Sequence, residues 1–312
     1  MNTLRQNTNF QSVQKIIQIS GVLLRICAFS VFIGRAWQHL FWDAPYRALA
    51  WNEGWLKGLV EGLTDMTWQE YVTSPAVDAG ITVSVRLTGA FYLIAALLCL
   101  FAQGRRKLPG IIWLVGSVLL TTLAFLYMKE RFFQVGQFLE YALQIGSPVL
   151  LYVWVYRGSD AGKTNLNSGF WKNMLLACKI LITLTFICHG LYAMGYYPRP
   201  GFFVDMTINI FGVYETTAHK MLWWAGLLDM VISVGIFVPP IARVCLLYAV
   251  LWGLLTAFAR VVANFYADFP WQSLHQYTFE TIYRLPHGLI PLFVLFVTRS
   301  GVIRRKQEGF MV

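Results

Sequence analysis

Charged side chains are scarce in this chain of 312 residues. Asp, Glu, Lys and Arg make up only 13% of it, whereas a soluble domain carries about 25%. Hydrophobic residues account for 57% and aromatic residues for 16%. The apolar residues come in runs of about 20, which is the length that a helix needs to cross a hydrocarbon core roughly 30 Å thick. The composition excludes a disordered chain, a fibre and an ordinary soluble enzyme. It predicts an all-α, polytopic membrane protein.

Motifs for covalent or metal chemistry are also missing. The five cysteines lie in apolar runs and none forms a CxxC pair, so a disulfide, a zinc finger or a thiol relay is not expected. We find neither a Gly-rich phosphate loop nor a Ser–His–acid triad with a supporting motif. The net charge of +10 is typical of cytoplasmic loops and does not indicate nucleic acid. Residues 1–14 lack a small-residue cleavage site before the first apolar run, so no cleaved signal peptide is predicted.

The apolar runs predict eight transmembrane helices, with short hydrophilic gaps between them. The predicted spans are residues 16–41, 81–102, 108–128, 138–156, 174–194, 221–238, 241–263 and 282–298.

Basic residues are concentrated on one side of these spans. The segments on that side contain the acids Asp160 and Glu308, whereas most acids lie in the segments of the other side. Because cytoplasmic loops are enriched in Lys and Arg, we place both termini in the cytoplasm and the multi-pass protein in the cell inner membrane. The basic residues behind this orientation are Arg5, Lys15, Arg105, Arg106, Lys107, Arg157, Lys163, Lys172, Arg243, Arg299, Arg304, Arg305 and Lys306.

The first outer segment, residues 42–80, is too long for a simple turn. Trp51, Trp55, Leu59 and Leu63 recur every four residues in it, with charged residues between them. Tryptophan at helical spacing suits the headgroup layer, so we predict one or two interfacial helices there. Two helix starts are indicated as well: a capping box in Thr67-Trp-Gln-Glu70, and an N-cap followed by proline in Ser74-Pro75.

The two halves of the chain resemble each other at a shift of 154 residues. This shift brings Phe32-Ile-Gly-Arg35 onto Phe186-Ile-Cys-His189, and the fourth and eighth predicted spans share a polar start followed by a proline. With an even number of spans in each half, the repeat is parallel. We therefore predict a first four-helix repeat at residues 1–157, a cytoplasmic linker at 158–173 and a second repeat at 174–312. The alternative is chance similarity between apolar helices.

The second half also resembles the DoxX-like membrane proteins. The shared features are His189-Gly190 near the end of its first helix, Asp229 in the glycine-containing second helix, and Glu280 at the start of its last helix. The first half has Glu140 at the last of these places. It departs from the pattern at the other two, where Arg35 and Leu93 stand. The resemblance implies a four-helix unit present as two tandem copies. It also implies relatives among subunits associated with quinone-linked sulfur oxidation and membrane redox maturation. Such an analogy indicates the fold more strongly than the function.

Ionisable and amide side chains gather toward the outer ends of the predicted spans. Such groups are costly inside a membrane, so each needs a partner or a function. Pro148 and Pro291 each follow a polar residue by four positions and so free a carbonyl oxygen there. We infer a partly hydrated, outward-facing cavity near the junction of the two halves. Its candidate ligand-binding residues are Arg35, His39, Arg86, Glu140, Gln144, His189, Asp229, Arg260, Glu280, Arg284 and His287.

Helix dipoles and arginines favour an acidic or oxygen-rich amphiphile as the ligand. Arg86 lies near the positive end of a helix, so it needs an anion, which Asp43, Glu140 or a ligand could supply. The alternative is an internal network of ion pairs that only holds the helices together. His189 and His287 could lie at similar depth, but the repeat does not pair them. We therefore expect no haem and no metal.

Three functions follow from these features. The first is a redox-associated subunit that binds a quinone and works with a periplasmic or membrane partner at residues 42–80 and 195–218. In it, Arg35 and Arg284 donate to ligand oxygens, and His189 and His287 relay protons. The second is a transporter of a small anion or lipid precursor, and the third is a non-catalytic scaffold subunit. A membrane carboxylase or acyltransferase lacks any catalytic motif here.

Overall fold

The computed structural model describes residues 2–101, 106–158, 163–165 and 168–299, and every regular element among them is a helix. The prediction of an all-α polytopic membrane protein is confirmed. In this part of the chain, seven segments are long and apolar enough to cross a membrane: Val13–Phe41, Pro75–Phe101, Lys107–Glu130, Val135–Arg157, Gly169–Met194, Ala242–Ala263 and Pro270–Thr298. The predicted inner charges Arg105, Asp160, Arg304, Arg305, Lys306 and Glu308 lie outside the described residues, as does part of the predicted linker.

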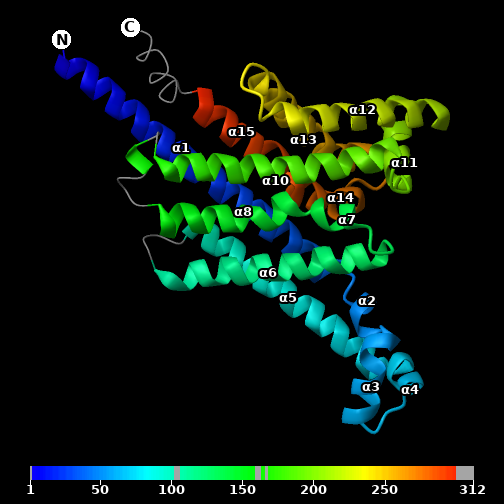
Figure 1. Ribbon diagram of the computed structural model, residues 1–312. Helices are drawn as coiled ribbons and strands as arrows, with labels where there is room; N and C mark the ends of the chain where they lie inside the picture. Colours follow the sequence, from blue (N-terminus) through cyan, green and yellow to red (C-terminus); the bar gives the residue numbers. More distant parts are fainter. Residues whose placement is uncertain (1, 102–105, 159–162, 166–167, 300–312) are drawn as a thin grey trace.

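The helices run between two ends of an elongated bundle (Figure 1). In the first half they are α1 (Asn2–Phe41), α2 (Arg47–Ala50), α3 (Glu53–Leu63), α4 (Trp68–Thr73), α5 (Pro75–Phe101), α6 (Lys107–Glu130), α7 (Val135–Leu139), α8 (Ala142–Tyr152) and the π-helix η1 (Val153–Arg157). In the second half they are α10 (Gly169–Met194), α11 (Gly201–Phe211), α12 (Glu215–Gly235), α13 (Ala242–Ala263), α14 (Pro270–Arg284) and α15 (Pro286–Arg299). We call the end that carries α7, α11 and α14 the outer end, after the predicted orientation.

The predicted span at residues 221–238 corresponds to α12, which has 21 residues. This helix is not among the seven apolar segments, and Lys220 and Asp229 make it more polar than the others. It nevertheless packs along α10 (Figure 1). Since α1 begins and α15 ends at the same end of the bundle, α12 supplies the pass from the outer to the inner end that the connectivity requires. That it also crosses the membrane stays a prediction.

Corresponding helices of the two halves pack in the same pairs. In the first half α1 packs on α5 and α6 packs on α8, and in the second half α10 packs on α12 and α13 packs on α15. The first helix of each half also contacts the proline-containing helix of its own half. Such correspondence is what a duplicated unit would give. The origin of the chain by duplication stays a prediction.

The outer segment 42–80 is helical, as predicted, but it forms three short helices, α2, α3 and α4, and not one or two. Both halves of the predicted capping box are present at α4: Glu70 N donates to the Thr67 hydroxyl, and Thr67 N donates to the Glu70 carboxylate. These hydrogen bonds from Thr67 lower the pKa of Glu70. α5 begins at Pro75, and the Ser74 hydroxyl accepts from Val77 N. Turn chemistry of this kind is local, which is why it can be read from the sequence.

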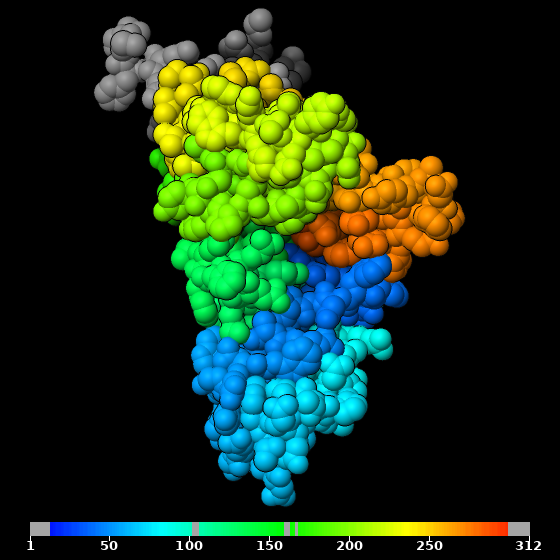
Figure 2. Space-filling view, turned by 90° about the vertical axis from the view of Figure 1, so that its right-hand side faces the viewer, coloured from blue at the N-terminus to red at the C-terminus, as the bar shows by residue number. Residues whose placement is uncertain are grey.

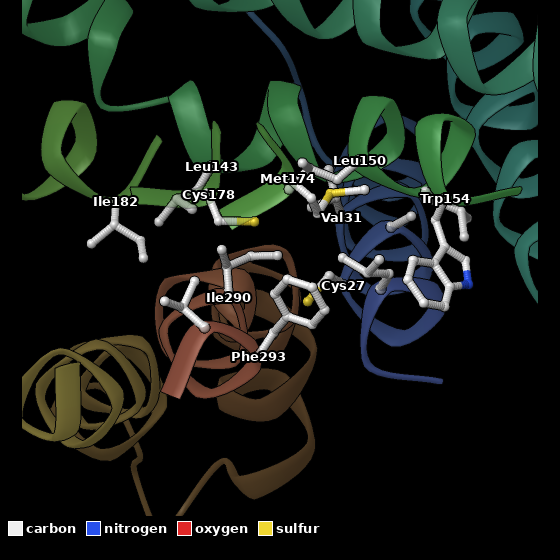
Figure 3. Packing of buried hydrophobic residues seen from close by; sticks show 14 of the residues in the cluster. Cys27, Val31, Leu143, Leu150, Trp154, Met174, Cys178, Ile182, Ile290 and Phe293 are labelled. Carbon is white, nitrogen blue, oxygen red and sulfur yellow. The ribbon is translucent and has the colours of Figure 1, made fainter. Parts of the chain in front are cut away.

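The inner half of the bundle is closed by tightly packed apolar side chains. Cys27 and Val31 of α1 meet Met174 and Cys178 of α10, while Phe293 approaches from α15 (Figure 3). All five cysteines are free and buried. The core therefore lies between the two halves and joins them.

Close helix contacts depend on glycine. A Cβ atom added to Gly253 of α13 would overlap the main chain of His287 in α15. We expect Gly253→Ala to force these two helices apart and to lower the free energy of unfolding by about 1–3 kcal/mol. Thermal unfolding in detergent, followed by helical circular dichroism, measures this. Gly58→Ala in α3 is the matched control, because open space surrounds that position. Equal melting temperatures for Gly253→Ala and wild type would contradict the proposed contact.

Candidate functional site

Two cavities lie side by side in the outer half of the bundle. One has a volume of about 320 Å³ and is lined mainly by apolar residues. The other has a volume of about 420 Å³ and a largely polar lining. We call them the apolar cavity and the polar cavity. They share a wall formed by His189, Phe203, Met206, Arg260, Arg284 and His287.

The apolar cavity is built within the second half of the chain. Its walls come from α10, α11, α12 and α13, with Arg284 and His287 closing the side toward the polar cavity. Leu255, Phe258 and Val262 of α13 line it and are also exposed on the side of the bundle. In a membrane this side faces the acyl chains, so the apolar cavity is open to the lipid phase.

The polar cavity lies where the two halves meet. The first half contributes Arg131, Glu140 and Gln144, and the second half contributes residues of α10, α11, α13 and α14. Viewed from the outer end, a dark-orange part of the chain is recessed between the yellow-green, green and blue parts, while the bright-orange part projects to the right (Figure 2). The predicted cavity at the junction of the two halves is therefore present.

The histidines His189 and His287 meet at the shared wall. Their ring centroids are 5.5 Å apart in an edge-to-face arrangement. His287 Nδ1 lies 2.8 Å from the carbonyl oxygen of Arg284. A carbonyl only accepts, so Nδ1 carries the proton and Nε2 is the accepting nitrogen of the neutral ring. His189 Nδ1 is 3.6 Å from Glu140 Oε1, and Gln137 donates to the other oxygen of Glu140 at 3.0 Å.

Glu280 holds the two arginines of the shared wall. Its Oε2 lies 3.2 Å from Arg260 Nη1 and 3.4 Å from Arg284 Nη1. The guanidinium group of Arg260 also lies over the ring of Phe202, 4.3 Å from its centroid. This arrangement leaves other donor N–H groups of both arginines available to a ligand, because each guanidinium has five.

The formal charges around the polar cavity cancel. Arg131, Arg260 and Arg284 are balanced by Glu140, Asp205 and Glu280. Such a lining offers strong donors and acceptors without an excess of positive charge. It fits a neutral, oxygen-rich group better than a phosphate or carboxylate, which would need a net cationic site.

Arg35 and His39 do not line either cavity. Arg35 is fully buried, donates to Gln144 at 2.6 and 3.1 Å and to Gln38 at 2.6 Å, and lies 3.7 Å from the ring centroid of Tyr283. His39 Nδ1 donates to the Arg35 carbonyl, and its Nε2 accepts from the Tyr46 hydroxyl at 3.2 Å. Burial raises the pKa of Tyr46 to about 12, so this hydroxyl stays protonated. Arg35 thus supports Gln144 and Tyr283 in the wall of the polar cavity from behind, and His39 packs behind Arg35.

Arg86 is exposed on α5, away from both cavities. Asp43 pairs with Arg47 at 2.6 Å, and Glu140 pairs with His189. The expected pairing of Arg86 with Asp43 or Glu140 is therefore wrong. Arg86 lies on the face of α5 that points away from the bundle. The position of a residue along a predicted span does not reveal which face of the helix it occupies.

Asp229 lines the apolar cavity and is only 4% exposed. Its Oδ1 atom has no hydrogen-bond partner among the described residues. An unpaired buried polar atom costs free energy, so it needs an explanation.

Sequence reasoning missed the part played by α11. Phe203 and Met206 of this helix form a wall of both cavities, and residues 195–218 were expected to bind a partner instead. Trp252, Tyr141 and Tyr283 were missed too. Their signals were weak: aromatic residues beside Glu140 and Arg284, and a tryptophan one turn before Thr256 on an otherwise apolar helix.

Residues 183–271 match the model of the DoxX-like family. The DoxX-like segment begins in α10, spans α11, α12 and α13, and ends in the first turn of α14. It therefore includes His189, Asp229 and Arg260, and it confirms the DoxX-like resemblance for this part of the chain. No curated protein and no solved structure matches the sequence. Within the described residues, His, Cys, Asp and Glu form no group of three that could hold a metal ion.

Removing the charge of Glu280 should destabilise the shared wall. In Glu280→Gln, Arg260 and Arg284 lose their common counter-ion and repel each other. We expect a loss of about 2 kcal/mol, below the value for a fully buried pair because these side chains are 10–25% exposed. Thermal unfolding in detergent measures it.

The double variant Glu280→Gln/Arg284→Gln should recover part of this loss, because it removes the repulsion. Glu215→Gln is the control, since that carboxylate is 74% exposed at the start of α12. A single variant as stable as the control would show that the Glu280 ion pairs contribute nothing.

Proposed function

We propose that this DoxX-like integral membrane protein is a redox-associated subunit. In this proposal it binds a quinone or another oxygen-rich amphiphile in its two adjacent cavities. The observation that carries the proposal is the shared wall: an apolar cavity open to lipid meets a polar cavity at His189, Arg260, Arg284 and His287. A quinone has both an apolar body and ring oxygens, so it matches this division.

The residues of the shared wall suit the head group of such a ligand. Arg260 and Arg284 can donate hydrogen bonds to its oxygens. His287 Nε2 can accept a proton or a hydrogen bond, because its Nδ1 is committed to a carbonyl group. Glu140 lies beside His189 and also lines the polar cavity, so it offers a next proton acceptor toward the outer surface.

A redox partner would act at the outer end, on residues 42–80 and 195–218. The second of these segments includes α11, which covers both cavities. Tyr196 and Tyr214, at either side of α11, are highly exposed. In the proposed orientation the termini are cytoplasmic in the inner membrane and this surface faces the periplasm.

The transporter alternative is not favoured by the structure. Both cavities lie in the outer half of the helices, and the apolar core of α1, α10 and α15 fills the inner half (Figure 3). Alternating access would require this core to open. The scaffold alternative predicts that purified protein binds no amphiphile.

Binding of a short-chain benzoquinone to purified protein in nanodiscs tests the proposal. We expect saturable binding and a rise in melting temperature with ligand concentration. Trp252 lines the apolar cavity, so a bound quinone should quench its fluorescence, and Trp252→Phe should reduce this quenching. Protein that carries no quinone and shows no change with added quinone would favour the scaffold.

Filling the apolar cavity should block the ligand. Ala259 lines this cavity, and Ala259→Trp would place an indole in it. We expect at least tenfold weaker quinone binding with little change in unfolding temperature, because the new side chain occupies existing space. Leu247→Trp, at an exposed position of the same helix, is the matched control. Equal binding by both variants would place the ligand elsewhere.

A further inference from the structure

Asp229 is a polar residue of the apolar cavity with an unsatisfied side-chain atom. The two hydroxyl groups of the cavity lining are committed to their own helices: Thr207 donates to Phe203 O at 2.8 Å and Thr256 donates to Trp252 O at 2.9 Å. The nearby Ser233 hydroxyl donates to the main-chain oxygen of Asp229 and not to its carboxyl group. Asp229 Oδ1 thus has no partner among the described residues.

The depth of Asp229 is fixed by a close helix contact. α10 and α12 are nearest at Gly190 and Gly226, where a Cβ on Gly190 would lie 2.8 Å from the Gly226 carbonyl oxygen. Asp229 follows Gly226 by three residues toward the inner end, whereas His189 precedes Gly190 by one, so Asp229 lies about 3 Å deeper along the helices than His189. Asp229 and His189 both line the apolar cavity.

The charges of the site narrow the ligand class further. The polar cavity is formally neutral, and Asp229 adds an acidic group to the apolar cavity. An anionic amphiphile would therefore face a carboxyl group without gaining a free cation. A hydroxyl group, in contrast, can pair with the carboxyl group of Asp229 in either protonation state, because it both donates and accepts.

We propose that Asp229 is the specificity-determining residue of this site, and that it hydrogen-bonds a hydroxyl group on a neutral ring amphiphile of the hydroquinone type. The opposite oxygen of the ring then lies at the shared wall, within the reach of His189, His287 and the arginines. This inference rests on the proposed function, since it concerns the ligand bound in the same two cavities.

A ligand that lacks the hydroxyl group leaves the carboxyl group of Asp229 without a hydrogen-bond partner and so loses affinity. We expect wild-type protein to bind an alkyl hydroquinone at least about tenfold more tightly than its dimethyl ether. Titration calorimetry in nanodiscs, under reducing conditions, measures both affinities. A fatty acid of similar length serves as the anionic probe and should bind more weakly than the hydroquinone.

Variants at Asp229 should change this ratio. Asp229→Leu should bind the two ring ligands equally, whereas Asp229→Asn should keep most of the preference because an amide also offers a donor and an acceptor. Glu215→Leu, at the exposed start of the same helix and outside both cavities, is the control and should leave the ratio unchanged. If Asp229→Leu does not fold, the ratio of the affinities for hydroquinone and its dimethyl ether, measured for wild type and Asp229→Asn, still tests the proposal.

The outcomes separate the two proposals. Equal binding of hydroquinone and dimethyl ether to wild type would overturn the assignment to Asp229 while leaving a ligand site intact. Tighter binding of the fatty acid would overturn the neutral ligand class. Binding of no probe at all would overturn the proposed function itself.

Discussion

The site depends on one shared counter-ion. Glu280 lies between Arg260 and Arg284, at 3.2 and 3.4 Å. Its ion pair with Arg260 joins α14 to α13, and it accepts a hydrogen bond from Arg284 of its own helix. Without it, two guanidinium groups would lie together in a poorly solvated place, where like charges repel strongly. With it, the arginines can stand in the wall between an apolar and a polar cavity and still present donors to both. Because α14 continues directly into α15, the ion pair that holds α14 also sets the position of α15 and of its residue His287.

The two halves are joined by contacts that cross between them. Arg35 of α1 lies against Tyr283 of α14, and His189 of α10 lies against Glu140, next to α7. Arg35 and His189 are the residues that coincide at the shift of 154 residues between the halves. Each half thus contributes a polar residue of its first helix to a contact with the other half: Arg35 of α1 reaches α14, and His189 of α10 reaches the junction of α7 and α8. The polar cavity forms between these two contacts, so neither half contains it alone.

Length and apolar character allowed the helices to be predicted, and helical spacing placed Glu280, Arg284 and His287 on one face. The capping box of α4 was equally accessible, because it involves only neighbouring residues. Rotation of helices about their axes was not accessible. Arg86 points outward, and Arg35 is bound to Gln38 and Gln144 behind the cavity. The short helix α11 is an outer element by its position, and only packing shows that it covers the site. The neighbours of Asp229 lie on another helix, so they could not be predicted from the sequence.

The exposed position of Leu255, Phe258 and Val262 at the rim of the apolar cavity has a thermodynamic consequence. A hydrophobic molecule reaching this rim is already dissolved in the bilayer, so its transfer from water is not part of the binding step. Occupancy is then governed by the mole fraction of the molecule among lipids. A weak intrinsic interaction suffices to fill the cavity when the bilayer is rich in that molecule, and dilution of the bilayer with inert lipid empties it.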